Sequence, residues 1–157
     1  MIGIGGRFAM VSLLLAAACV GSSGGGGSNA SVMITAPQSG ASVALGTDTA
    51  KSVPVSFTLS NFTLKAPGTC GGAANCGHLH LVIDDYTSPC DPLAGVGNEK
   101  YNVQVITGTT TSAQFATCGA PAGSHTITLE VHDDAHADVK DANGNLIKSA
   151  PVSITTH

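Results

Sequence analysis

The chain has 157 residues, a formal net charge of −4 and only 10% charged residues. This mildly acidic balance lacks the clustered lysines and arginines of a nucleic-acid-binding surface, so no nucleic-acid partner is expected. Tryptophan is absent and aromatic residues make up 4%. The core must therefore come mainly from Val, Ile, Leu and Ala side chains, and a small exported core of this kind gains from disulfide cross-links.

The first residues predict a secretory signal peptide over 1–18. Arg7 supplies a positive charge, and the apolar run after it is too short to span a bilayer. The stretch LAAAC over 15–19 resembles the lipobox of bacterial lipoproteins, in which the cysteine becomes the lipidated first residue. Ala16 stands where that motif usually has leucine, so cleavage at an Ala-x-Ala site is the alternative. Lipidation of Cys19 would leave an even set of four cysteines, which favours a lipoprotein.

The Gly/Ser-rich segment over 19–31 predicts a flexible tether, because it has almost nothing to bury. A lipid on Cys19 followed by such a tether would hold the domain beside a membrane, with the lipid as its only membrane contact. The remainder, 32–157, has the size of one domain and no further apolar stretch long enough to span a bilayer. We therefore expect an exported protein anchored to a bacterial membrane, either periplasmic or at the cell surface.

The domain is predicted to be all-β. No window carries a helical period, and short runs of alternating apolar and polar residues recur instead. Turn-forming segments such as Pro121-Ala122-Gly123 separate these runs. Strands are expected over 31–36, 42–45, 53–62, 78–85, 101–107, 111–117, 125–132 and 146–155. About seven or eight short strands in a domain of this size predict an antiparallel β-sandwich.

Three segments resemble bacterial immunoglobulin-like domains: SVMITAPQSGASV over 31–43, PAGSHTITLEVHD over 121–133 and DANGNLIKSAPVSITT over 141–156. In addition, G-H-x-H-x-x-[IV]-D at 77–84, with a later P-x-G-x-H-T-x-x-[LV] strand at 121–129, is similar to a family of small exported bacterial domains of unknown function. This resemblance implies an immunoglobulin-like sandwich and supplies no activity.

The immunoglobulin strand order has a consequence for the cysteines. It makes 78–85 strand C and 125–132 strand F, which are antiparallel neighbours in one sheet. Each of the two pairs, Cys70 with Cys76 and Cys90 with Cys118, then falls at one end of the sandwich. The resemblance therefore implies the disulfides Cys70–Cys76 and Cys90–Cys118 among the three possible pairings.

Two histidines at alternate positions form a candidate metal site. Since Leu79, Leu81 and Ile83 must face the core, His78 and His80 project together from the outer face of their strand. Antiparallel pairing brings His132 and the segment HDDAHAD, with His136, near them. Imidazole with carboxylate suits zinc or copper, and an oxidising exterior favours Cu(II). The alternative, which we rank first from sequence, is that these histidines are solvated.

Other residues are assigned to the fold. His125 keeps phase with the core residues of its strand, so we expect a structural, hydrogen-bonding role. The acidic segment DDAHADVKDANGN over 133–145 does not have the spacing of an EF-hand and predicts a solvated loop. GHLHLVIDDYTSPC over 77–90 is similar to a stretch of copper/zinc superoxide dismutases. However, no histidine lies between His80 and His125, where the other ligands of that family would fall, so dismutase activity is not expected.

No catalytic motif is found: the chain has no G-x-S-x-G elbow, no H-E-x-x-H and no P-loop. We therefore expect a non-enzyme. The function ranked first is a tethered binding or interaction module that contacts a partner through loops or a sheet edge, with no certain cofactor. The alternative is a copper- or zinc-binding lipoprotein that uses His78, His80 and His132.

Overall fold

The computed structural model describes residues 28–85 and 88–157. For these residues it confirms the predicted all-β structure. The predicted signal peptide and Cys19 lie outside the described residues. The strands are β1 (Ser31–Ala36), β2 (Ala41–Val43), β3 (Ser52–Ser60), β4 (Thr63–Leu64), β5 (Cys76–Ile83), β6 (Leu93–Ala94), β7 (Lys100–Tyr101), β8 (Val103–Val105), β9 (Thr110–Gln114), β10 (Gly123–Asp133) and β11 (Val152–Thr156), and η1 (Val96–Asn98) is a short 3₁₀ turn. Within these residues no helix is long and apolar enough to cross a membrane.

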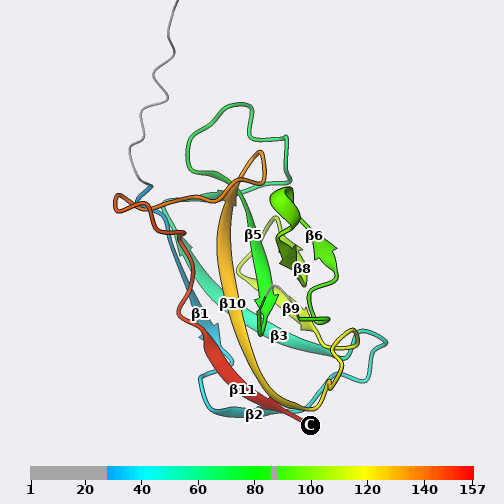
Figure 1. The fold of residues 1–157 in the computed structure, drawn as a ribbon. Helices are drawn as coiled ribbons and strands as arrows, with labels where there is room; N and C mark the ends of the chain where they lie inside the picture. The colour runs from blue at the N-terminus through cyan, green and yellow to red at the C-terminus, as the bar shows by residue number, and fades with distance from the viewer. Residues whose placement is uncertain (1–27, 86–87) are drawn as a thin grey trace, which may run out of the picture.

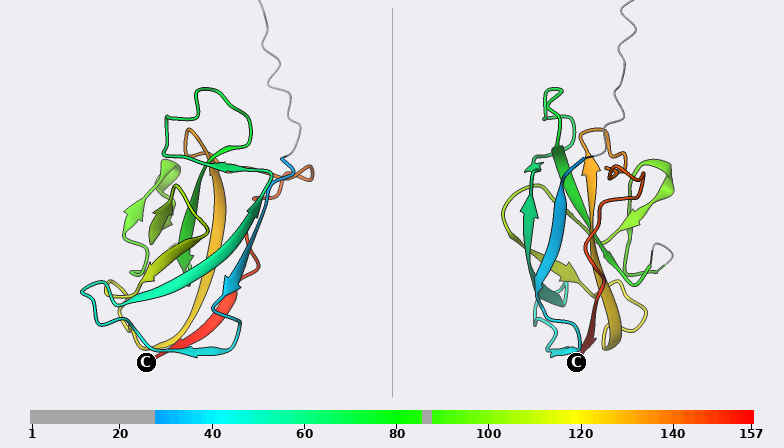
Figure 2. Two further views of the ribbon diagram at one scale, coloured as in Figure 1. Left: turned by 180° about the vertical axis from the view of Figure 1, so that it is seen from behind. Right: turned by 90° about the vertical axis from the view of Figure 1, so that its left-hand side faces the viewer.

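The strands form two main sheets that lie in separate layers (Figures 1 and 2). The smaller sheet has the order β1-β3-β9 and is antiparallel throughout. The larger sheet has the order β2-β11-β10-β5-β4, and β8 also pairs with β5. Most neighbours in it are antiparallel, but the short strands β2 and β4 run parallel to their partners. A two-stranded ribbon of β6 and β7 lies on the side of the large sheet that faces away from β1 and β3 (Figure 2).

One hydrophobic core joins the two sheets. Side chains at alternate positions of each strand point to the same face, so every second residue of a strand can enter this core. The expected inward row of β5 is confirmed, because Leu79, Leu81 and Ile83 have no exposed surface. Other buried contributors include Val32 and Ile34 from β1, Val53, Val55 and Phe57 from β3, Ala113 from β9, and Ile127, Leu129 and Val131 from β10.

Each expected strand has an observed counterpart, but the short strands β4 and β6 are not among those expected, and one strand boundary differs clearly. The last strand was expected over 146–155, but β11 begins at Val152. The segment before it bonds to the far half of β10 instead, where Val131 N–H donates to the Ile147 carbonyl. The long strand β10 therefore has two successive neighbours on this side, first β11 and then an irregular segment. The sequence pattern alone made these two segments look continuous.

The structure contains the two disulfides implied by the immunoglobulin strand order. Cys70 is bonded to Cys76 with the Cα atoms 5.8 Å apart, and Cys90 is bonded to Cys118 with the Cα atoms 4.1 Å apart. The first closes a loop between β4 and β5, and the second joins the segment after β5 to the segment after β9. Such cross-links are typical of proteins that fold outside the reducing cytosol and are consistent with export.

The closest approach between β5 and β10 requires a glycine. Gly77 lies opposite Asp133 in the antiparallel register. A Cβ atom at Gly77 would overlap the His132 carbonyl oxygen and lie 2.8 Å from the Cα atom of Asp133. Any larger residue must therefore push the two strands apart at the end where His78 and His132 face each other.

We predict that Gly77→Ala lowers the free energy of unfolding by about 1–3 kcal/mol or more, because overpacked side chains force backbone shifts of this cost. Urea unfolding monitored by circular dichroism would measure it. Gly119→Ala is the matched control, since a Cβ atom there has only the Pro89 side chain nearby, at 3.9 Å. Equal stability of the two variants would contradict the steric argument.

Candidate metal centre

The histidines on the outer face of the large sheet are buried. His78, His80 and His132 expose 0%, 1% and 0% of their surface. The interpretation of these residues as solvated is therefore wrong. The alternation along β5 was predicted correctly, but the outer face of this strand is covered, and every residue of β5 is buried.

Part of this cover comes from residues 93–101, which we call the cover segment and which contain β6, η1 and β7. The Tyr101 ring stacks on the His80 ring with centroids 3.8 Å apart and planes 16° apart. Gly95 also approaches His80 so closely that an added Cβ would lie 3.3 Å from its Cε1 atom. The cover segment thus replaces solvent over the centre of the histidine cluster.

His136 reaches the cluster from the turn that follows β10. The Asp133 carboxylate accepts hydrogen bonds from the N–H groups of Ala135 and Ala137 at 2.8 and 2.9 Å, which fixes this turn. His136 itself adopts a left-handed conformation with φ of +64°. Such backbone geometry is uncommon for a residue with a side chain. Here it accompanies an imidazole that contacts His78.

Three ring nitrogens converge in this cluster. His78 Nε2 lies 3.1 Å from His80 Nε2 and 3.1 Å from His136 Nδ1. These residues form a group whose ligand atoms all lie within 4.8 Å of one another. Nitrogens bound tetrahedrally to one zinc ion at 2.0–2.1 Å would be about 3.3 Å apart. His78 Nε2 therefore lies from each of the other two nitrogens at nearly the separation that a shared ion requires.

His132 does not join these three residues as the sequence suggested. It lies directly opposite His78 in the register of β5 and β10, but its ring stacks on His80 with centroids 3.9 Å apart. It belongs instead to a second group with His80 and Glu99, again with ligand atoms within 4.8 Å. Sequence analysis missed Glu99, because it lies in the cover segment and no periodic pattern connects it to the histidines.

Several polar atoms of the cluster lack hydrogen bonds. They include His78 Nδ1 and both ring nitrogens of His132. The nearest carboxylate oxygens to His132 belong to Glu130 and Asp138, at 3.9 and 3.8 Å, which is too far for hydrogen bonds. A buried polar atom left in this state costs about 1–3 kcal/mol. The folded protein therefore keeps these buried ring nitrogens without hydrogen bonds, at a cost in stability.

Burial also keeps two of the histidines neutral. It lowers the pKa of His78 to about 4 and the pKa of His80 to about 2, and the neighbouring imidazoles add to both shifts. Burial raises the pKa of Glu99, and the nearby Asp138 carboxylate raises it further. Neutral imidazole is the form that binds metal ions. The cluster thus holds His78 and His80 ready to act as ligands near neutral pH.

The structure places His125 in the fold, away from this cluster. Its Nδ1 lies 2.9 Å from Asp84 Oδ2, and its Nε2 lies 3.0 Å from the Ala120 carbonyl oxygen. Its ring also packs edge-on against Phe115. Cys90 and Cys118 lie nearby, but their sulfurs are bonded to each other and are not free to bind an ion. These contacts match the structural role expected for His125.

The acidic residues after β10 bond mainly to backbone groups. Asp134 Oδ1 accepts hydrogen bonds from the N–H groups of Thr69 and Cys70, and Asp141 Oδ1 accepts from those of Asn143 and Asn145. Each of these bonds fixes a loop, as expected for a segment without EF-hand spacing. The carboxylates of Asp134 and Asp141 therefore act as loop caps.

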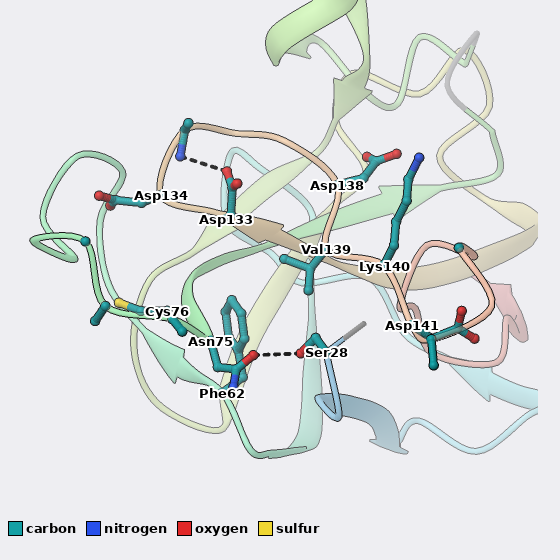
Figure 3. A pocket seen from close by; sticks show the side chains of 16 residues that line it. Ser28, Phe62, Asn75, Cys76, Asp133, Asp134, Asp138, Val139, Lys140 and Asp141 are labelled. Carbon is teal, nitrogen blue, oxygen red and sulfur yellow. Dashed lines mark hydrogen bonds between the residues drawn. The ribbon is translucent and has the colours of Figure 1, made fainter. Parts of the chain in front are cut away.

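A surface pocket lies beside the turn that carries His136 (Figure 3). It measures about 750 Å³ and is lined by Phe62, Asn75, Asp138 and Lys140, among others. None of the clustered histidines lines it. The pocket and the histidine cluster are therefore separate features, and the cluster is closed because side chains fill it.

Comparison with known proteins matched no family model, no curated protein and no solved structure. The resemblances drawn from the sequence motifs therefore stay predictions.

We predict that the metal-free protein loses stability as the pH falls from about 6.5 toward 4. The unfolded chain takes up protons on these histidines near pH 6.5, whereas folded His78 and His80 take them up only near pH 4 and 2. Between these values the unfolded state binds more protons, so the free energy of unfolding decreases with acidification. Each histidine contributes up to about 1.4 kcal/mol per pH unit.

Urea unfolding with a chelator present would measure this effect at about pH 7.5 and about pH 5. Asp91 opposes it, because burial raises the pKa of this carboxyl to about 7 and stabilises its protonated form in the folded state. The variant His78→Gln isolates the histidine contribution and should show a smaller loss than the wild type. An identical pH dependence in both proteins would contradict the prediction.

Proposed function

We propose that this protein is an exported lipoprotein whose immunoglobulin-like domain binds one Cu(II) or Zn(II) ion through His78, His80 and His136. The observation that carries the proposal is the convergence of three ring nitrogens in a buried cluster, with His78 Nε2 3.1 Å from each of the other two. His78 Nε2 faces both of the other nitrogens, but it carries either one proton or one lone pair and so forms a hydrogen bond with only one of them. An ion at their meeting point supplies a partner for all three nitrogens.

The chemistry of the donor set favours copper over zinc. Imidazole nitrogens bind both ions, and the Irving–Williams order places Cu(II) above Zn(II) for the same ligands. The oxidising exterior expected for an exported protein also keeps copper in the Cu(II) state. The domain acts without catalysis, as a protein that buffers copper or zinc or hands it on. This reverses the ranking drawn from sequence, because the histidines that a passive module would leave in solvent are buried.

The strand order supports the immunoglobulin-like part of the proposal. The small sheet β1-β3-β9 corresponds to strands A, B and E, and the succession β11-β10-β5-β8 corresponds to G, F, C and C′. The lipid anchor on Cys19 and the tether over 19–31 complete the arrangement. The metal centre is then held beside a membrane without being embedded in it.

We predict that His136→Ala weakens Cu(II) binding at least about tenfold, because it removes one of three ligands. His80→Ala should remove most binding. Competition with a chelator of known affinity, using the full chain in mild detergent, would measure the dissociation constants.

His125→Ala is the control for this experiment. It should leave Cu(II) affinity unchanged and lower the free energy of unfolding by about 1–3 kcal/mol, since it removes hydrogen bonds to Asp84 and Ala120. Equal loss of Cu(II) binding in His125→Ala and His136→Ala would show that the site lies elsewhere. Binding no tighter than that of an exposed histidine pair would refute the proposed function.

We predict that metabolic labelling with a palmitate analogue in a bacterial host tags the wild-type chain. Cys19→Ser should lose the label and be released in soluble form, because the thiol of this residue carries the lipid. Labelling that persists in Cys19→Ser would exclude the lipoprotein assignment without affecting the metal centre.

A further inference from the structure

We infer that the histidine cluster contains a second metal subsite, formed by His132 and Glu99 with His80 common to both ligand groups, so that the centre holds two divalent ions. This inference rests on the proposed function and extends it. The ligand atoms of His80, His132 and Glu99 all lie within 4.8 Å of one another. Each subsite keeps two ligands of its own, namely His78 and His136 in the first and His132 and Glu99 in the second. A neutral imidazole has one unprotonated nitrogen and binds one ion. His80 would therefore bind both ions as an imidazolate, one through each ring nitrogen, and would release its remaining ring proton to solvent when the second ion binds.

His132 is the strongest indication of this subsite. Its side chain is fully buried, and neither of its ring nitrogens makes a hydrogen bond. A neutral imidazole has one hydrogen-bond donor and one acceptor. Burial has removed both ring nitrogens of His132 from water, and no hydrogen bond replaces the lost hydration. Its ring stacks on His80 with centroids 3.9 Å apart, and its ligand atom falls in a group with those of His80 and Glu99. An ion shared with Glu99 would engage this ring without moving the first group.

The charges around His132 fit a second cation. Glu130 Oε2 lies 3.9 Å from one ring nitrogen of His132, and Asp138 Oδ1 lies 3.8 Å from the other. The carboxylates of Glu99, Glu130 and Asp138 therefore all lie near the buried ring of His132. Two divalent ions a short distance apart repel each other strongly in a dry site, and nearby negative charge offsets this repulsion. The first subsite contains only nitrogen, whereas the second combines nitrogen and oxygen, a set that zinc accepts readily.

The second ion would also connect the cover segment to the sheet. His132 belongs to β10, whereas Glu99 belongs to the cover segment, directly before Lys100 and two residues before Tyr101. In the metal-free protein the cover segment contacts the cluster through the Tyr101 ring stacked on His80 and through Gly95 beside His80. A metal bond to Glu99 would therefore hold residues 93–101 in place. Hydrogen exchange of their amides reports this effect independently of metal content.

The test uses full-length protein loaded with Zn(II), freed of loosely bound metal and analysed by inductively coupled plasma mass spectrometry. Wild type should retain two zinc ions per chain and Glu99→Gln one, because the amide is a poor ligand. Asp48→Asn is the matched control, since it removes the same charge from the loop before β3 and should retain two ions. Amide exchange over 93–101 should slow when zinc is added to wild type and stay fast in Glu99→Gln.

Two further variants separate this inference from the proposed function. His136→Ala should retain one ion, held by the second subsite, and the double variant with Glu99→Gln should retain none. One ion in both wild type and Glu99→Gln would overturn the second subsite and leave the first intact. Loss of all zinc in Glu99→Gln would show a single shared site and would also overturn it. Two ions in His136→Ala would instead refute the ligand set of the proposed function.

Discussion

The antiparallel pairing of β5 with β10 is the constraint on which the rest of the structure depends. Its register sets His78 opposite His132 and His80 opposite Glu130, while Leu79 and Leu81 lie opposite Val131 and Leu129. Alternation then sends these four apolar residues into the core and the ligand-type residues to the other face, where Val82 also lies. A slip of one residue would exchange the two faces, so the hydrophobic core fixes the composition of the candidate centre.

Histidines on a covered face of the sheet lose the hydration of their ring nitrogens, which costs free energy. Contacts with the cover segment offset part of this cost. Histidine rings on an open sheet would be hydrated, whereas here Tyr101 and Gly95 exclude water from His80. Ring stacking gains contact area, but it does not replace the hydrogen bonds that the buried nitrogens have lost. The residual deficit is concentrated on His78 and His132.

Much of the fold follows from local patterns, whereas the centre does so only in part. Alternation predicted the strands and their inward rows, and the strand order led to both disulfide pairs. The prediction that His78 and His80 are exposed is wrong, because a strand pattern distinguishes the two faces of a sheet but does not show what covers them. The cover is made by two-residue strands with no periodicity of their own. The grouping of His132 with Glu99, apart from His136, depends on how the side chains pack, which sequence spacing does not encode.

The cover segment is held at both ends, and this bears on how a bound ion would leave the centre. Cys90, just before it, is tied by a disulfide to Cys118, and the Asn102 side chain just after it donates a hydrogen bond to the Cys90 carbonyl. The segment therefore forms a loop with both ends fixed, so it opens by losing only its own contacts while the sheets stay intact. If the centre holds a metal ion as proposed, local opening of this segment would govern how long the ion stays bound, even in a chain with very high global stability.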